Sequence, residues 1–129
     1  PPNVLDAIEI AEEKTKEYSN HYYNIALAYG SRQEITHAIR QIAQKVKDGE
    51  MEVDDICEDT VSTYLYTADF PDPDLVLRTS GEERVSNFLL WQLAYSELYF
   101  TDVYWPGFRK IDFLRAIRSY QMRQRRFGT

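Results

Sequence analysis

Hydrophobic residues recur along this chain at two different spacings, and the change of spacing divides the chain into elements. Apolar positions three and four residues apart indicate helices, whereas unbroken apolar or aromatic runs indicate buried strands. The predicted helices cover residues 4–18, a stretch from Ser31 to a stop at Asp48–Gly49, and residues 60–67, 88–98 and 111–125. The predicted strands cover residues 22–29, 75–77 and 99–104. Ser31 and Glu34 have the spacing of a capping box for the second helix.

The order of these elements predicts the fold class. Helices that alternate with strands are typical of an α/β protein, in which right-handed crossovers build a parallel sheet with flanking helices. Three strands make a thin sheet, so we expect amino-terminal strands to be missing from residues 1–129, which would form a single partial domain. The chain begins with Pro1 rather than Met and shows no signal-peptide pattern, so we expect a piece of a longer protein.

Composition and charge narrow the possible partners. Hydrophobic residues make up 43% of the chain, enough for a core, and no apolar run is long enough to span a bilayer. The net charge is −6, but residues 1–103 carry 8 Lys+Arg against 20 Asp+Glu, whereas residues 104–129 carry 7 against 1. The acidic part argues against nucleic acid, and the basic tail predicts a local contact with an anion. The single Cys57 favours a reducing compartment, so we expect a cytoplasmic protein.

The loop after the middle strand is the main candidate for chemistry. Arg78 directly follows that strand, Arg84 lies further along, and Ser86 and Asn87 are placed to cap the apolar helix at 88–98. Ligands of open α/β sheets bind beyond the carboxyl ends of strands, where two guanidinium groups, a hydroxyl and a helix amino terminus can hold a phosphate. Gly81 would let the backbone approach such an anion closely. The alternative is that both arginines pair with nearby carboxylates, namely Asp72, Asp74, Glu82 or Glu83.

Two further charged sites each have a functional and a structural interpretation. Glu97 ends the apolar helix, where a carboxylate must be paired or bound to a metal. It could hold Mg²⁺ together with a phosphate, or form an internal salt bridge, and spacing alone favours the salt bridge. The basic carboxyl end is either a frayed terminus or an arm that brings Arg126 and the Gly128 backbone to an anion. His21 and His37 lack a surrounding catalytic motif, so we expect structural or surface roles for both.

One long motif resembles a known protein family. The stretch RTSGEERVSNFLLWQLAYSELYFTDVYWPGF at residues 78–108, with the terminal RQRRFG, closely resembles the carboxyl half of the cis-prenyltransferases, the undecaprenyl and dehydrodolichyl diphosphate synthases. The earlier NIALAYGSRQEI fits the middle segment of the same family, and the resemblance is closest to archaeal members. It implies a transferase that condenses isopentenyl diphosphate with an allylic diphosphate primer into a long-chain Z-polyprenyl diphosphate, with Mg²⁺ as cofactor.

The resemblance also implies roles for individual residues and for partners. The positions that match the family's isopentenyl diphosphate site are Arg78, Arg84, Ser86, Arg126 and Gly128. Glu97 matches the glutamate that helps to place Mg²⁺, and the terminal RxG element reaches the site across a homodimer interface in the family. The implied partners are the two diphosphate substrates, a second copy of the chain and, through the lipid product, a membrane surface, but no nucleic acid.

One departure from the family limits what this chain is expected to do alone. The MDGNGRWA-like loop that carries the family's catalytic Asp is absent from these 129 residues, so we expect no catalytic residue and no turnover within them. A rival hypothesis is a non-catalytic partner subunit that donates its RxG tail to a complete prenyltransferase, although such a subunit need not keep a diphosphate site of its own. A basic-tailed nucleic-acid module is the third hypothesis, and it would show strongly salt-dependent binding.

Overall fold

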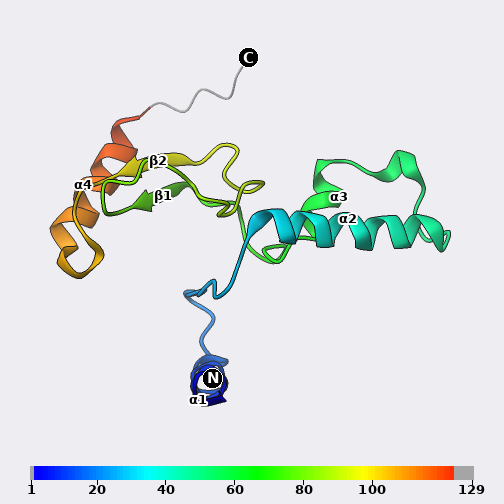
Figure 1. Ribbon diagram of the computed structural model, residues 1–129, viewed down its shortest axis with the longest axis horizontal. Coiled ribbons are helices and arrows are strands. Elements are labelled where there is room, and N and C mark those ends of the chain that lie inside the picture. Colours follow the sequence, from blue (N-terminus) through cyan, green and yellow to red (C-terminus); the bar gives the residue numbers. More distant parts are fainter. Residues whose placement is uncertain (1, 124–129) are drawn as a thin grey trace.

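Four helices and one small sheet make up the structure, a computed structural model that describes residues 2–123. The helices are α1 (Pro2–Thr15), α2 (Ser31–Lys47), α3 (Glu58–Thr63) and α4 (Lys110–Met122). The strands are β1 (Leu75–Arg78) and β2 (Glu97–Phe100), and two 3-10 turns, η1 (Val53–Asp55) and η2 (Trp105–Gly107), lie in the connections. The prediction of an α/β chain with a parallel sheet and flanking helices is therefore confirmed (Figure 1).

The two parallel strands form the framework of the candidate site. Their register pairs Leu75 with Glu97 and Arg78 with Phe100, which places Arg78 at the carboxyl edge of the sheet. The pairing continues beyond the strands, since the Thr101 amide donates to the Arg78 carbonyl oxygen at 2.9 Å. On the other side of β2, α4 lies against the strand (Figure 1). The loop that follows Arg78 is therefore held at the edge where α/β proteins bind their ligands.

The predicted strand at residues 22–29 does not form, so this prediction is wrong. Within the described residues the sheet has two strands instead of the predicted three. An extended segment becomes a strand only when a neighbouring strand takes its backbone hydrogen bonds, and no described strand pairs with this segment. Its side chains stay open, with Tyr23 88% and Ile25 65% exposed. The expectation that further strands precede this chain stays a prediction.

The predicted helix at residues 88–98 is also wrong, because the chain follows a series of turns there. The backbone φ angle is positive at Ser86 (46°), Asn87 (64°) and Leu89 (47°), a conformation that a right-handed helix does not contain. The Leu90 amide donates to a serine side chain of α2 at 2.9 Å rather than to a carbonyl of its own segment. Hydrogen bonds to α2 thus hold the start of this segment, and a bond of helical spacing is present further along, from the Leu93 amide to the Leu89 carbonyl oxygen at 2.9 Å.

The helix α2 carries half of the small apolar core of the described chain. The buried apolar residues there are Ala38, Ile42, Leu65 and Ala116. Ala38 and Ile42 lie one turn apart on α2, and α2 contacts α3. Ile39, which belongs to the same predicted apolar repeat, is 57% exposed. The helix ends as predicted, because Gly49 adopts a positive φ of 72° directly after the Asp48 cap.

The predicted capping box at the start of α2 does not form. Gly30 occupies the N-cap position and has no side chain with which to bind the first helical amides. Ser31 and Glu34 are both completely buried, and each bonds a distant part of the chain instead. The Ser31 Oγ accepts the Leu90 amide at 2.9 Å, and Glu34 Oε1 accepts the Tyr66 amide at 2.8 Å. Tertiary partners therefore take the side chains that local spacing assigned to a cap.

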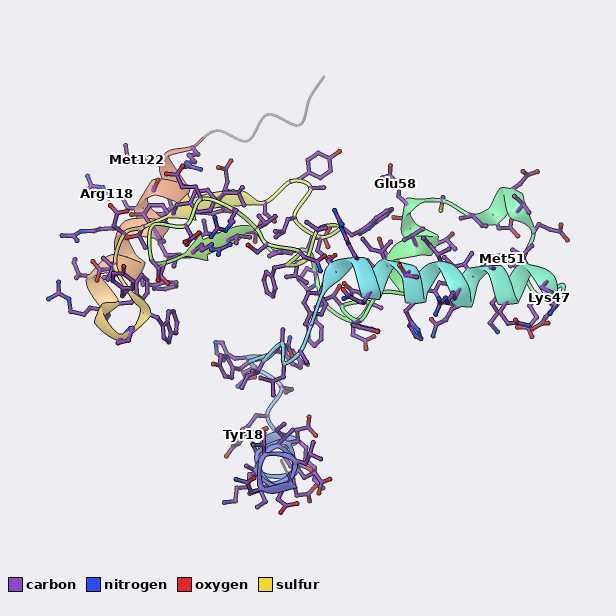
Figure 2. All side chains as sticks on the ribbon, viewed as in Figure 1. Tyr18, Lys47, Met51, Glu58, Arg118 and Met122 are labelled. Carbon is purple, nitrogen blue, oxygen red and sulfur yellow. The ribbon has the colours of Figure 1, made fainter. Side chains whose placement is uncertain are left out.

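The molecule is extended. The helix α1 stands apart from the other elements, and α2 projects away from the sheet (Figure 1). Lys47 and Met51 lie at one end of the molecule, with Arg118 and Met122 at the other (Figure 2). The accessible surface is 10874 Å², whereas a compact monomer of this length would expose about 7,100 Å². Among residues 2–123, no helix combines the length and the apolar character needed to cross a bilayer.

Candidate functional site

A cavity of about 290 Å³ lies at the carboxyl end of β1, and it brings together three of the expected residues. Arg78, Arg84 and Ser86 all line it. The rest of its wall is apolar and comprises Val76, Leu77, Val85, Phe88, Leu93 and Phe100. Two guanidinium groups and a hydroxyl beside an apolar wall can bind an anionic group that is joined to a hydrocarbon chain.

Arg78 is held by neutral groups of its own loop. Its guanidinium Nη1 donates to Ser86 Oγ at 3.0 Å and to the carbonyl oxygen of Arg84. These two contacts join both ends of the loop between residues 78 and 86. Because both acceptors are neutral, they orient the guanidinium group without cancelling its charge.

Arg84 forms an ion pair with Glu82, one of the carboxylates that the sequence analysis left as an alternative partner. The Arg84 side chain is 67% exposed and that of Glu82 is 39% exposed. Ion pairs at such exposed positions contribute only about 0–1 kcal/mol to stability. Arg84 can therefore exchange Glu82 for a more highly charged anion in the cavity.

Gly81 has a different part from the one expected. Its φ is +69°, and a Cβ at this position would lie 3.0 Å from Asp102 Oδ1. The Gly81 amide donates to the Thr101 carbonyl oxygen at 2.9 Å, and the Ser80 amide donates to the Val103 carbonyl oxygen at 3.0 Å. These amides extend the pairing of β1 with the chain after β2, so they are not directed at an anion. The glycine is needed here for the turn of the backbone.

No helix amino terminus contributes to the cavity at Ser86, because the segment after it is not helical. The start of α2 is hydrogen-bonded to this segment, since its Ser31 amide donates to the Asn87 carbonyl oxygen at 2.8 Å. Binding of an anion at this cavity would therefore depend on side chains. This corrects the expectation that a helix dipole would add to the two arginines.

Glu97 forms the salt bridge that its spacing favoured. The Arg123 Nη1 donates to Glu97 Oε2 at 2.8 Å and to the Leu98 carbonyl oxygen at 2.9 Å. The strand register places Glu97 opposite Leu75, three residues before the level of Arg78, which is ~10 Å along a strand. Among the described residues, no group of three or more His, Cys, Asp or Glu side chains is placed to hold a metal ion. Within one chain, Glu97 and the cavity therefore do not form a shared cation site.

The two tail residues expected to bind diphosphate lie outside the described residues. Arg126 and Gly128 both follow Arg123, the last residue that the structure describes. Arg123 itself caps the end of α4, where its amide donates to the Tyr120 carbonyl oxygen at 3.1 Å. The roles of Arg126 and Gly128 stay predictions.

The buried carboxylate of Glu34, predicted only as part of a capping box, forms a hydrogen-bond network instead. The Tyr29 hydroxyl donates to Glu34 Oε2, and Gln92 Nε2 lies 3.3 Å from both carboxylate oxygens. Burial and the bond to Glu34 raise the pKa of Tyr29 to about 12. The burial of Glu34 could have been predicted from its position in the sequence. It lies on the same helical stripe as Ala38 and Ile42, the two buried apolar residues of α2.

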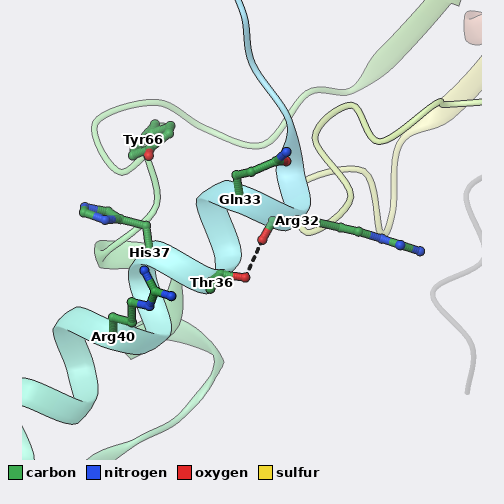
Figure 3. A pocket seen from close by; sticks show the side chains of 6 residues that line it. All are labelled: Arg32, Gln33, Thr36, His37, Arg40 and Tyr66. Carbon is green, nitrogen blue, oxygen red and sulfur yellow. Dashed lines mark hydrogen bonds between the residues drawn. The ribbon is translucent and has the colours of Figure 1, made fainter.

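A second, more open pocket of about 450 Å³ lies on the outer face of α2. Its lining residues are Arg32, Gln33, Thr36, His37, Arg40 and Tyr66. Figure 3 shows that the Arg32 side chain points away from His37 and Arg40. The cationic groups therefore do not converge on one point. His37 instead contacts the Tyr66 ring, with centroids 5.8 Å apart, and its Nε2 lies 2.9 Å from Gln41 Nε2, in agreement with the structural role expected for it.

Comparison with known proteins places the chain in a family. The family model described as "Putative undecaprenyl diphosphate synthase" matches residues 1–128, almost the entire chain. The chain belongs to the cis-prenyltransferase family. The resemblance seen in the sequence is thereby confirmed. Its similarity to archaeal members is confirmed too, since curated proteins similar to this chain come from archaea.

Several cis-prenyltransferases are close to this chain in sequence and in structure. It is 61% identical over 130 residues to the tritrans,polycis-undecaprenyl-diphosphate synthase (geranylgeranyl-diphosphate specific) of Methanocaldococcus jannaschii, covering 99% of this chain and 46% of that protein. The protein of the same name from Methanopyrus kandleri is 61% identical over 128 residues, covering 99% and 47%. A crystal structure of lavandulyl diphosphate synthase from Lavandula x intermedia with dimethylallyl diphosphate matches with a TM-score of 0.94 and 44% identity, covering 100% of this chain and 56% of that one. The chain therefore spans about half the length of these cis-prenyltransferases.

Proposed function

We propose that this chain carries the isopentenyl diphosphate-binding part of a cis-prenyltransferase, an enzyme that condenses isopentenyl diphosphate with an allylic diphosphate into a long-chain Z-polyprenyl diphosphate. The observation that carries the proposal is the cavity at the carboxyl end of β1, which Arg78, Arg84 and Ser86 line together. Family membership and the names of the archaeal relatives support the same reaction. Their names also support geranylgeranyl diphosphate as the allylic primer.

The composition of the cavity suits the chemistry of this substrate. A diphosphate carries several negative charges, and planar guanidinium groups can bind its oxygens in pairs. Arg78 is already oriented by Ser86 and by the loop carbonyl, so little rearrangement is needed for it to bind. The apolar wall would accept the five-carbon group. These residues would hold the substrate and neutralise its charge, a task of positioning rather than of proton transfer.

The proposal extends to Mg²⁺ and to a homodimer. Mg²⁺ supplies positive charge to a diphosphate group and is often held by one or two carboxylates together with phosphate oxygens. Glu97 is paired with Arg123 and is not among the residues that line the cavity of its own chain. We therefore propose that its part in placing Mg²⁺ involves a second copy of the chain. The same holds for the proposed delivery of Arg126 and Gly128 across a dimer interface.

We expect no turnover from residues 1–129 alone. The resemblance assigns the catalytic Asp to a MDGNGRWA-like loop, and these residues contain no such loop. A non-catalytic partner subunit would share this property. The lining of the cavity by Arg78, Arg84 and Ser86 supports substrate binding by this chain itself, and so it supports the first hypothesis over the partner subunit.

Calorimetric titration with isopentenyl diphosphate in the presence of Mg²⁺ tests the proposal. Changing Arg78→Ala or Arg84→Ala should weaken binding about tenfold or more, because a hydrogen bond to a charged group is worth about 1.5–3 kcal/mol. Arg118→Ala is the matched control, since it removes the same charge from an exposed position on α4. Equal affinity of the unsubstituted chain and the Arg84→Ala variant, or no binding by either, would contradict the proposal.

A further inference from the structure

Asn87 connects the cavity to the start of α2. It directly follows Ser86, whose Oγ accepts a hydrogen bond from the Arg78 guanidinium group at 3.0 Å. On its other side, the Ser31 amide donates to the Asn87 carbonyl oxygen at 2.8 Å, and the Arg32 amide donates to Asn87 Oδ1 at 2.9 Å. Two adjacent residues of one short segment therefore hold the guanidinium group and the helix.

These contacts make Asn87 the cap of a helix that is distant in sequence. The first amides of a helix have no partner within it, and the N-cap residue Gly30 has no side chain to bind them. Asn87 provides the missing acceptors, and its Nδ2 also donates to Gln33 Oε1 at 3.3 Å. Asparagine is among the residues best suited to accept the first amides of a helix.

Two local features fit asparagine at position 87. Its φ is 64°, a left-handed conformation that asparagine adopts more readily than most residues with a side chain. At Gly30, an added Cβ would meet Gln33 Oε1 first and would lie 2.8 Å from Asn87 Nδ2, so the glycine leaves the space in which these two side chains bond each other. The φ of Gly30 is −153°, extended backbone that any residue adopts, so the requirement for glycine there is spatial.

We infer that Asn87 is a positioning residue for diphosphate binding. By capping α2 it holds the backbone that presents Ser86, and Ser86 in turn orients the Arg78 guanidinium group in the cavity. Asn87 is not among the residues that line the cavity, so it acts through these neighbours rather than on the ligand. The inference rests on the proposed function, because that function assigns the ligand.

Variants at position 87 separate the cap from the backbone conformation. Asn87→Gly keeps access to the left-handed backbone but removes the side chain, whereas Asn87→Asp keeps an acceptor oxygen for the Arg32 amide. In calorimetric titrations with isopentenyl diphosphate, we expect Asn87→Gly to bind about tenfold more weakly and Asn87→Asp to stay within about threefold of the parent. Asn20→Gly, at an exposed position outside the helices, is the matched control and should bind as the parent does.

A second measurement needs no ligand. The nuclear magnetic resonance signals of the Arg78 guanidinium protons should shift in Asn87→Gly, and these protons should exchange faster with solvent. In Asn87→Asp, both the positions of the signals and the exchange rates should return to those of the parent. Gly30→Ala should weaken binding by displacing the Asn87 amide, and it should do so much less in an Asn87→Gly background. If Asn87→Gly does not fold, the single variant Gly30→Ala still tests the inference.

The outcomes distinguish the inference from the proposed function. If Arg84→Ala weakens binding but Asn87→Gly changes neither the affinity nor the Arg78 signals, the inference is overturned and the proposed function stands. If the parent chain binds no isopentenyl diphosphate, both the proposed function and this inference are wrong.

Discussion

Tyr29, which lies just before α2, contacts both the first turn of this helix and the segment that contains Phe88. Its hydroxyl donates to the buried Glu34, and its ring meets that of Phe88 edge to face, with centroids 5.7 Å apart. Burial, followed by the bond to Glu34, raises the pKa of Tyr29 to about 12. The neutral hydroxyl is thus the form that the fold stabilises.

This raised pKa predicts a loss of stability at high pH. A group whose pKa is higher in the folded state stabilises the fold below its ordinary pKa of about 10, and this contribution is lost as the pH rises through about 12. Urea unfolding at a series of pH values should therefore show a decline over that range. The decline should be smaller in Tyr29→Phe, whereas Tyr23→Phe, at a position 88% exposed, should behave as the parent. Identical profiles for the two variants would contradict the role given to Tyr29.

At Arg78, the residue type and position pointed to the cavity, but the partners could not be derived from sequence. A guanidinium group directly after a buried strand has to meet an acceptor or reach solvent. Several carboxylates were equally near in sequence, yet Arg78 bonds Ser86 and a loop carbonyl. These acceptors belong to the same loop, in which Ser86 has a left-handed backbone with a φ of 46° that the sequence pattern does not reveal. For Arg84, in contrast, the carboxylate alternative Glu82 is the partner that the structure shows.

At the scale of elements, α2 illustrates how periodicity identifies a helix without identifying its buried face. Ile39 and Ile42 belong to the same apolar repeat. In the structure Ile42 is 4% exposed and Ile39 is 57% exposed, so the rest of the chain covers only one side of the helix at this level. The difference arises from the neighbour of the helix and not from the helix itself.

This contrast gives a paired prediction for stability. Ile42→Ala should lower the free energy of unfolding by about 2–4 kcal/mol, since it removes buried methyl groups and leaves a cavity. Ile39→Ala should change it by less than about 0.5 kcal/mol, because the side chain is already largely in water. Chemical unfolding monitored by circular dichroism measures both. Similar losses for the two variants would contradict the difference in burial between Ile39 and Ile42.

The segment at 88–98 shows the opposite failure, in which a strong apolar pattern did not produce the expected element. Its apolar residues would have covered a helix almost all round. Instead, the Leu90 amide and the backbone of Asn87 bond the start of α2. A helix here would have used the Asn87 carbonyl oxygen for its own first hydrogen bond, so the Ser31 amide at the start of α2 would have lost this acceptor.

At the scale of the whole molecule, open apolar surface is the dominant feature. The chain exposes 10874 Å², against about 7,100 Å² for a compact monomer of its length. Large apolar side chains lie open in α1 and in residues 22–29, for example Leu5 at 63% and Leu27 at 60%. Exposed patches of this extent are typical of surfaces that another polypeptide covers.

The extended shape predicts how the isolated chain behaves in solution. Small-angle X-ray scattering should give a radius of gyration clearly above the value of about 14 Å expected for a compact domain of this length. A dye that fluoresces in apolar surroundings should also bind to it. A monomer with a radius near 14 Å and no dye binding would show that α1 and residues 22–29 fold back onto the rest of the chain.

The sequence by itself determined the family, the α/β class, the three residues that meet at the end of β1, and the presence of two strands that frame the site, although β2 covers Glu97–Phe100 and not the predicted residues 99–104. These depend on local pattern and on a motif of contiguous residues, both of which can be read along the chain. Only the tertiary structure decided that residues 22–29 form no strand, that 88–98 form no helix, that Glu34 is buried, and that Asn87 caps α2. Each of these depends on whether backbone hydrogen-bonding groups find partners far away in sequence. Such pairings are settled by the packing of distant segments, and no local periodicity records them.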